Sequence, residues 1–190
     1  WSWYSNFRQI CNFKMKKKIE SKTVKVFDIL HKEQLRKRKI FFRLKNLLST
    51  KFLGVGKKFF KNKVCLDAGC GANANATFNL LNLGAKFVHG IDINKSVLVT
   101  ARKTIDKKFK GKSVFKVSNL LKIDYPDNFF DFVHCAGAVH HTFSYKKSIK
   151  ELCRVTKPGG YLYLEFYGKG GLVREITNLL RKKYNKEKKF

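Results

Sequence analysis

Two short segments carry residues suited to binding an adenosine-type ligand. The run Asp67-Ala68-Gly69-Cys70-Gly71 follows an apolar stretch and precedes a predicted helix. Gly69 and Gly71 allow a sharp turn and a close approach of the backbone to a ligand, where a Cβ would clash. Asp92 lies 21 residues after Gly71, at the end of the next apolar stretch. A carboxylate there can accept hydrogen bonds from ribose hydroxyls, in NAD or in S-adenosylmethionine.

Asp67 separates these two ligands. A pyrophosphate next to this carboxylate, at ~4 Å and an effective dielectric of ~20, would be repelled by about 4 kcal/mol. S-adenosylmethionine carries an ammonium and a sulfonium, both of which a carboxylate attracts. Asp67 therefore favours S-adenosylmethionine over NAD. The alternative is that Asp67 only caps the helix that follows the turn.

Apolar runs alternate with helical patterns from residue 63 onward, and these elements must position the two segments. Strands are predicted at 63–67, 87–91, 114–117, 130–135 and 161–166, and helices at 74–83, 95–108, 145–155 and 172–184. The Pro158-Gly159-Gly160 run is expected to stop the third helix. Such alternation predicts an α/β fold, a three-layer sandwich around a Rossmann-like, mostly parallel sheet. Ligands of such sheets bind at the carboxyl ends of the strands.

The sequence divides into two regions. Residues 1–60 are basic, and apolar positions from 24 to 53 have helical spacing, so we expect helices that cover the substrate side. Residues 61–190 form the predicted ligand-binding domain.

Four segments together resemble the successive motifs of class I S-adenosylmethionine-dependent methyltransferases, most closely those that act on small molecules. They are Val64–Gly71, Asp92, the stretch 117–131 and the Lys157-Pro158-Gly159-Gly160 turn. The resemblance implies that the glycine turn holds the methionine part of S-adenosylmethionine and that Asp92 holds the ribose. The expected cofactor-binding residues are Asp67, Gly69, Cys70, Gly71, Asp92, Ile93, Asn119, Leu120 and Ala136.

The sequence departs from the family pattern at three points. Asn73 stands where the family usually has glycine, and asparagine tolerates the left-handed conformation better than most residues. Asn119 stands where an acid often faces the adenine amino group. Its amide oxygen can accept that N–H, or Asn119 can be a simple turn residue. We also expect the domain to lack the family's C-terminal strand hairpin, because no strand is predicted after Phe166.

The loop after the fourth predicted strand contains two candidate catalytic residues, His140 and His141. The resemblance places this loop opposite the transferable methyl group. Histidine is suited to removing a proton from a hydroxyl or an acidic carbon, and His140 is slightly preferred. The two residues can instead orient the loop. In the family that the sequence resembles, enzymes that methylate exocyclic nitrogens of bases or glutamine amides commonly carry an Asn-Pro-Pro-Tyr-type run in this loop. Its absence here argues against those acceptors but does not exclude RNA 2′-hydroxyls. The acceptor that we expect is an O or C nucleophile of a small molecule.

The charge is strongly positive, with 42 Lys and Arg against 13 Asp and Glu. Residues 1–63 alone hold 19 basic and 3 acidic groups. Such a surface attracts polyanions, so an RNA methyltransferase and a non-catalytic polyanion-binding module remain alternatives. Lysine also decorates any solvent-facing surface, which makes charge a weak guide to the partner.

Five scattered cysteines predict neither a disulfide framework nor a metal site, and they fit a reducing, cytoplasmic setting. No apolar run reaches the ~20 residues that a membrane-spanning helix needs.

Overall fold

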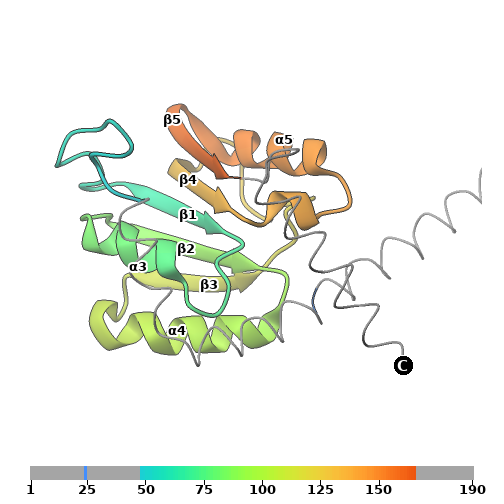
Figure 1. The fold of residues 1–190 in the computed structure, drawn as a ribbon, viewed down its shortest axis with the longest axis horizontal. Coiled ribbons are helices and arrows are strands. Elements are labelled where there is room, and N and C mark those ends of the chain that lie inside the picture. Colours follow the sequence, from blue (N-terminus) through green and yellow to red (C-terminus); the bar gives the residue numbers. More distant parts are fainter. Residues whose placement is uncertain (1–23, 25–47, 166–190) are drawn as a thin grey trace, which may run out of the picture.

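A computed structural model describes Val24 and residues 48–165 of the chain. Five strands form one sheet in the order β3-β2-β1-β4-β5, and every neighbouring pair is parallel (Figure 1). Their bounds are β1 (Val64–Ala68), β2 (Phe87–Asp92), β3 (Ser113–Val117), β4 (Phe130–Ala136) and β5 (Thr156–Glu165). The order reverses between β1 and β4, which is the position where sheets of this kind bind ligands.

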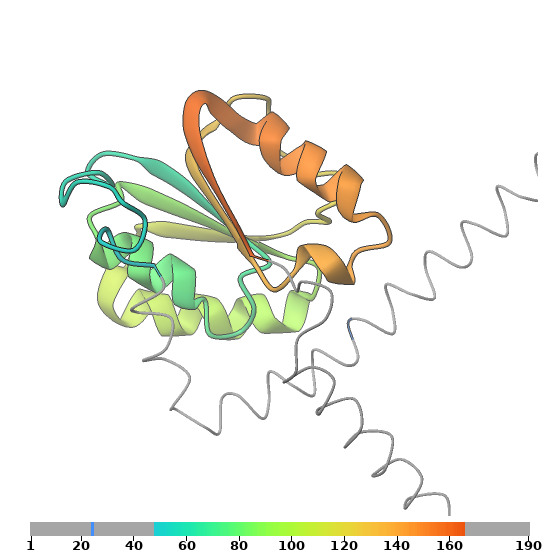
Figure 2. The same cartoon turned by 45° about the horizontal axis from the view of Figure 1, so that its top comes forward.

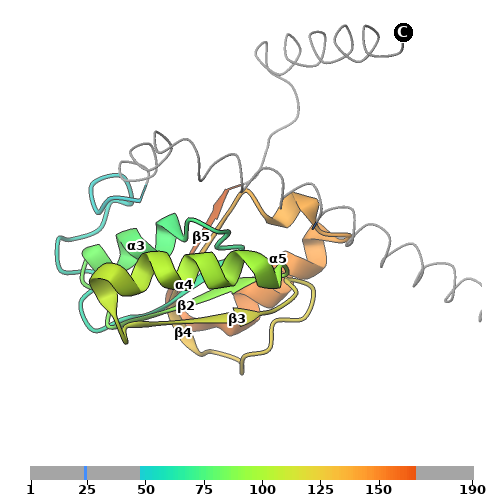
Figure 3. The ribbon, with the colours of Figure 1, turned by 90° about the horizontal axis from the view of Figure 1, so that it is seen from below.

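Helices cover both faces of the sheet. The helices α3 (Asn75–Asn82) and α4 (Lys95–Phe109) lie on one face, and α5 (Tyr145–Val155) lies on the other (Figure 2). Seen from below, α3 and α4 run side by side across their face (Figure 3). The predicted three-layer sandwich is confirmed.

Alternation along the strands determines which layer each side chain joins. Cys65 and Phe132 belong to the hydrophobic cluster on the side of α3 and α4. Their neighbours Leu66 and Val133 belong to the cluster on the side of α5. The next residues, Asp67 and His134, are paired in register and return to the face of α3. Two polar groups therefore lie together in the interior, at the carboxyl end of the central strands.

The start of β5 differs from the prediction. The strand begins at Thr156, directly after α5, and its pairing with β4 shifts between Phe130 and Phe132. The Pro158-Gly159-Gly160 run lies within this irregular part, and Gly159 has φ 71°. Regular pairing with β4 begins at Tyr161, as predicted, whereas the strand itself starts at Thr156, which pairs with Phe130 before the irregular part.

Several predicted features lie outside the described residues. These features are most of the predicted N-terminal helices and the predicted helix at 172–184. The expected lack of a C-terminal strand hairpin also concerns residues outside the described part. None of the helices in the described part of the chain is long and apolar enough to cross a membrane.

Arg154 fastens the segment between β3 and β4 to α5. Its Nη1 donates to the carbonyl oxygen of Tyr125 at 2.9 Å and to Asp127 Oδ1 at 2.7 Å. Its Nη2 donates to the carbonyl oxygen of Ile123 at 2.8 Å and to Glu151 Oε2 at 2.8 Å. The segment between β3 and β4 contains no helix. The side chain of Arg154 therefore supplies several of the hydrogen bonds that hold this segment against α5.

We expect Arg154→Met to lower the free energy of unfolding by about 2 kcal/mol, since hydrogen bonds to charged groups contribute roughly 1.5–3 kcal/mol. Urea denaturation measures this change. Lys150→Met is the matched control, because Lys150 is an exposed cation on the same helix, and it should change stability by less than about 0.5 kcal/mol. Equal effects of the two substitutions would contradict the anchoring role.

Candidate functional site

Two cavities adjoin at the carboxyl ends of β1, β2 and β4. The first lies between Asp92, Leu120 and the loop after β4. The second lies over the glycine turn, between Asp67, Asn75 and His134. Gly69 and Ala136 line both, so the cavities meet beside the first glycine of the turn. This is the edge of the sheet that the strand order predicts for a ligand.

The glycine turn is shaped by contacts that only glycine permits. The amides of Gly69 and Cys70 both donate to the carbonyl oxygen of Ile91, at 2.8 and 3.0 Å. Gly69 has φ 79°, and a Cβ built on it would lie 2.5 Å from the Cβ of Ala138. Gly71 also has a positive φ, of 60°. The turn is thus held between β2 and the loop after β4.

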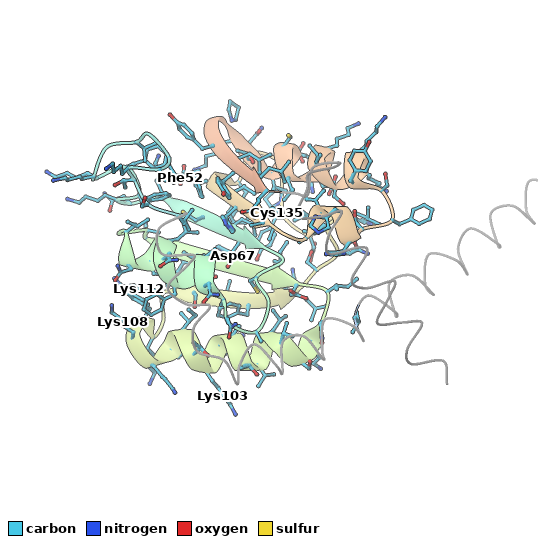
Figure 4. The ribbon with its side chains drawn as sticks, viewed as in Figure 1. Phe52, Asp67, Lys103, Lys108, Lys112 and Cys135 are labelled. Carbon is cyan, nitrogen blue, oxygen red and sulfur yellow. The ribbon has the colours of Figure 1, made fainter. Side chains whose placement is uncertain are left out.

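The carboxylate of Asp67 caps α3. Its Oδ2 accepts hydrogen bonds from the backbone N–H of Thr77 at 2.9 Å and from the Thr77 hydroxyl at 2.8 Å. Its Oδ1 lies 3.4 Å from His134 Nδ1. Asp67 is buried, with 2% of its surface exposed, yet it lines the second cavity. Figure 4 shows it in the interior, while Lys103, Lys108 and Lys112 extend outward. Asp67 therefore makes the helix cap that the sequence raised as an alternative, and it lines a cavity as well.

The carboxylate of Asp92 connects two turns. Its Oδ2 accepts from the amide of Gly71 at 3.0 Å, and its Oδ1 accepts from the amide of Asn94 at 2.9 Å. The side chain lines the first cavity and is half-buried. Because an ionised carboxylate has about four acceptor positions, Asp92 is able to orient the glycine turn and also to accept from a ligand hydroxyl.

Two residues that line the first cavity, Asn94 and Ser118, each carry a buried polar atom, Nδ2 and Oγ, that has no hydrogen-bond partner among the described residues. The two residues are 6% and 8% exposed. Unpaired buried groups are costly, and a ligand with its own donors and acceptors removes that cost. Ile93 and Leu120 supply apolar surface to the same cavity. This mixture suits a nucleoside.

Asn119 takes the turn role that the sequence left open. Its amide oxygen accepts from the backbone N–H of Leu121 at 2.9 Å. The residue still lines the first cavity. The oxygen expected to accept an adenine amino group is therefore already engaged in shaping the segment after β3.

The two histidines after β4 differ in their position. A short 3-10 helix, Val139–His141, places His141 but not His140 in the wall of the first cavity. Burial lowers the pKa of His141, and the neighbouring His140 adds to this effect. Both ring nitrogens of His140 are shielded from solvent. The sequence slightly preferred His140, whereas the lining of the cavity favours His141.

Cys70 lines the second cavity as a neutral thiol. Burial raises its pKa, and the carboxylates of Asp67 and Asp92 raise it further. No group of three or more His, Cys, Asp or Glu that could hold a metal ion occurs in the part of the chain that the structure describes.

Ten of the eleven predicted site residues thus line one of the two cavities, and His140 is the exception. The first cavity contains Gly69, Asp92, Ile93, Asn119, Leu120, Ala136 and His141, and the second contains Asp67, Gly69, Cys70, Gly71 and Ala136. Sequence reasoning missed Asn75, Asn94, Ser118 and His134. The register between β1 and β4, which no local pattern contains, brings His134 beside Asp67.

Comparisons with known proteins agree with this geometry. The family model described as "Methyltransferase domain" matches residues 66–164, just over half of the chain. The ubiquinone/menaquinone biosynthesis C-methyltransferase UbiE of Pseudomonas aeruginosa is 36% identical over 96 residues, which are 50% of this chain and 35% of that protein. Phosphoethanolamine N-methyltransferase 2 of Caenorhabditis elegans is 27% identical over 112 residues, 59% of this chain and 25% of that protein.

A solved structure shares the fold. A protein of Methanococcus maripaludis assigned to the S-adenosyl-L-methionine-dependent methyltransferases superposes with a TM-score of 0.60 at 20% identity, over 84% of this chain and 73% of that one. The chain spans less than half the length of both relatives named above.

We expect Gly69→Ala to destabilise the protein by more than Gly111→Ala. The two glycines have nearly equal φ, 79° and 75°, so both substitutions carry the left-handed strain of about 1–2 kcal/mol. Only at position 69 does the new Cβ also meet another atom, whereas nothing lies within 4 Å at position 111. Urea denaturation of both variants measures the difference, and equal losses of stability would contradict the close contact with Ala138.

Proposed function

This chain belongs to the class I S-adenosylmethionine-dependent methyltransferases, and we propose that it transfers a methyl group from S-adenosylmethionine to an O or C nucleophile of a small molecule. The observation that carries the proposal is the pair of adjoining cavities, which contains ten of the eleven residues expected from the sequence.

The residues in the cavities fit this cofactor. Asp92 lines the first cavity and can accept from ribose hydroxyls. Asn94 and Ser118 line the same cavity, and each has a buried polar atom without a hydrogen-bond partner among the described residues. Gly69 and Gly71 leave room for the methionine part beside Asp67. Bound there, the cofactor supplies an electrophilic methyl group on a sulfonium, so the chain itself needs no nucleophile of its own. Its task is to align two reactants, which contributes roughly 7–11 kcal/mol in favourable cases.

The acceptor is proposed to lie on the side of the loop after β4. Ala136, Gly137 and Ala138 leave space there, and Phe143 adds apolar surface. In this proposal His141, which lines the same cavity, removes a proton from the acceptor. UbiE is named as a C-methyltransferase and the Caenorhabditis elegans relative as an N-methyltransferase. The relatives therefore do not identify the atom that this chain methylates, and the assay below identifies it. The positive charge of the chain makes RNA the alternative acceptor.

The test is methyl transfer from labelled S-adenosylmethionine to a panel of catechols, quinols and β-diketones, with total RNA as the contrasting acceptor. We expect label in small molecules and not in RNA. Asp92→Asn should weaken S-adenosylmethionine binding at least tenfold, since a hydrogen bond to a charged group is worth roughly 1.5–3 kcal/mol. Asp124→Asn, a control on an exposed loop, should leave that affinity unchanged. Label found only in RNA would overturn the small-molecule proposal.

We expect His141→Asn to lower kcat by about a hundredfold, the lower range for general base catalysis, without changing KM for S-adenosylmethionine. A base works in its neutral form. Because burial lowers the pKa of His141, the neutral form persists to a lower pH than for an exposed histidine. The rate of the parent should therefore be flat near pH 7 and fall only on the acid side of histidine's ordinary ~6.5. A larger loss in His140→Asn than in His141→Asn would contradict the assignment.

A further inference from the structure

Three segments lead into the amino ends of β1, β2 and β3, and all three are rich in lysine. Residues 48–63, 83–86 and 107–112 together contain ten lysines and neither aspartate nor glutamate. Residues 48–165 as a whole hold twenty Lys and Arg and eight Asp and Glu. Half of these basic residues and none of the acids therefore gather at one edge of the sheet. We call this group the basic rim, and its members are Lys51, Lys57, Lys58, Lys61, Lys63, Lys86, Lys107, Lys108, Lys110 and Lys112.

Backbone hydrogen bonds hold the three segments of the basic rim side by side. The amide of Lys86 donates to the carbonyl oxygen of Lys63 at 2.9 Å. The amide of Val88 donates to the carbonyl oxygen of Lys112 at 3.1 Å. Because neighbouring strands lie about 4.8 Å apart, these lysines form a row across the sheet. Figure 4 shows Lys108 and Lys112 extending outward at the end of the molecule where the strands of Figure 1 begin.

The charges of the basic rim are not neutralised by ion pairs. Lys63 is half-buried and the other nine lysines are exposed. None of the ten takes part in an ion pair within the described residues. Asp131, near the start of the adjacent strand β4, is already paired with Lys157 at 2.7 Å. The rim therefore presents a field that attracts a partner carrying many negative charges.

Two exposed aromatic rings adjoin the basic rim. Phe52 follows Lys51 in the chain and is 57% exposed. Tyr161 of β5 is 50% exposed, and its ring centroid lies 4.8 Å from that of Phe59. Lys63 Nζ lies 4.9 Å from the centroid of the same Phe59 ring, so Tyr161 is close to the rim. Lysines beside exposed rings suit a single strand of nucleic acid, since lysines neutralise phosphates and bases stack on rings.

An anionic membrane is the other polyanionic surface that a row of lysines attracts. Proteins that lie on a membrane also insert an apolar face into it. Among the large hydrophobic side chains that are exposed in the described part of the chain, Phe52 alone belongs to the three rim segments. The rim thus offers charge with isolated rings and no apolar face, which favours nucleic acid.

We propose that the basic rim docks a single strand of nucleic acid, with phosphates on its lysines and bases on Phe52 and Tyr161. The inference does not rest on the proposed function, because the rim lies at the opposite end of the strands from the two cavities. The five residues of β1 span roughly 17 Å between these two ends. Nucleotides held on the rim are therefore too far from the cavities to receive a methyl group, and the strand is a docking partner.

Fluorescence anisotropy of the full chain with an oligouridylate tests this inference. A length of about 20 nucleotides exceeds the roughly 4–16 that a single-strand site covers. The variant Lys86→Gln, Lys112→Gln removes two charges from the rim, and the control variant Lys146→Gln, Lys150→Gln removes two exposed charges from α5. The two variants have the same net charge, so the comparison isolates where the charge lies.

We expect the rim variant to bind the oligouridylate at least about tenfold more weakly than the α5 variant at about 100 mM salt. The slope of log affinity against log salt should be shallower by about 1.4, since each phosphate contact on a single strand contributes about 0.7. Urea denaturation checks that both variants remain folded. Equal affinities of the two variants would show that binding follows total charge alone and would overturn the proposal.

The aromatic part of the proposal has its own test. Phe52→Ala should weaken binding of the oligouridylate by about tenfold, because one base loses its stacking partner. Phe52→Tyr keeps a ring and should bind as the parent does. A duplex RNA of the same length keeps its bases stacked inside, so Phe52→Ala and the parent should bind it equally. An equal loss for single strand and duplex would contradict stacking on Phe52.

Two further measurements separate the basic rim from other surfaces. Vesicles of phosphatidylcholine and phosphatidylserine should not compete with the oligouridylate for the protein. Vesicle binding that depends on the rim, without binding of the oligouridylate, would assign the rim to a membrane and overturn the proposal. S-adenosylhomocysteine should bind the rim variant as tightly as the parent. Failure of this ligand to bind the parent would overturn the proposed function and leave the rim to be decided by the RNA measurements.

Discussion

The buried carboxylate of Asp67 joins the central strand to the helix that follows it. Thr77 gives this carboxylate two hydrogen bonds, and the chain between the two partners, residues 68–76, forms the glycine turn and the start of α3. Burying a carboxylate without hydrogen-bond partners is costly. Any conformation of the turn that moved Thr77 away from Asp67 would carry this cost, so the turn is held in one conformation. The amides of the turn then reach Ile91 and Asp92 on β2, so that β1, β2 and α3 meet around the two cavities.

This constraint explains how a small domain shapes a ligand site mostly from backbone. Gly69 passes so close to Ala138 that the loop after β4 is also fixed by the turn. The same loop carries His141 and the small residues beside which the acceptor is proposed to lie. The cofactor side and the acceptor side of the site therefore depend on a single packed turn.

Much of the fold follows from the sequence because its signals are local. Short apolar runs located β1, β2, β3 and β4 to within about two residues, a typical error for element boundaries. The bounds of β5 required knowledge of its pairing with β4, which no local pattern contains. The spacing of Gly69 and Gly71 and the position of Asp92 predicted where the two cavities lie. These residues form turns whose geometry depends on residue type, so the sequence alone indicates them.

Other parts of the site were not predictable because they depend on the direction of single side chains. His134 looks like an ordinary strand residue until β1 and β4 are paired in register. Which of His140 and His141 reaches the cavity depends on one turn of 3-10 helix. The turn role of Asn119 and the cap made by Asp67 were open alternatives in the sequence, and only the contacts with Leu121 and Thr77 decide them.

The most direct test of the central claim is calorimetric titration of the folded chain with S-adenosylhomocysteine and, separately, with NAD at neutral pH. The arrangement of Asp67 and the glycine turn predicts saturable binding of S-adenosylhomocysteine and none of NAD. Binding of NAD without binding of S-adenosylhomocysteine would contradict it.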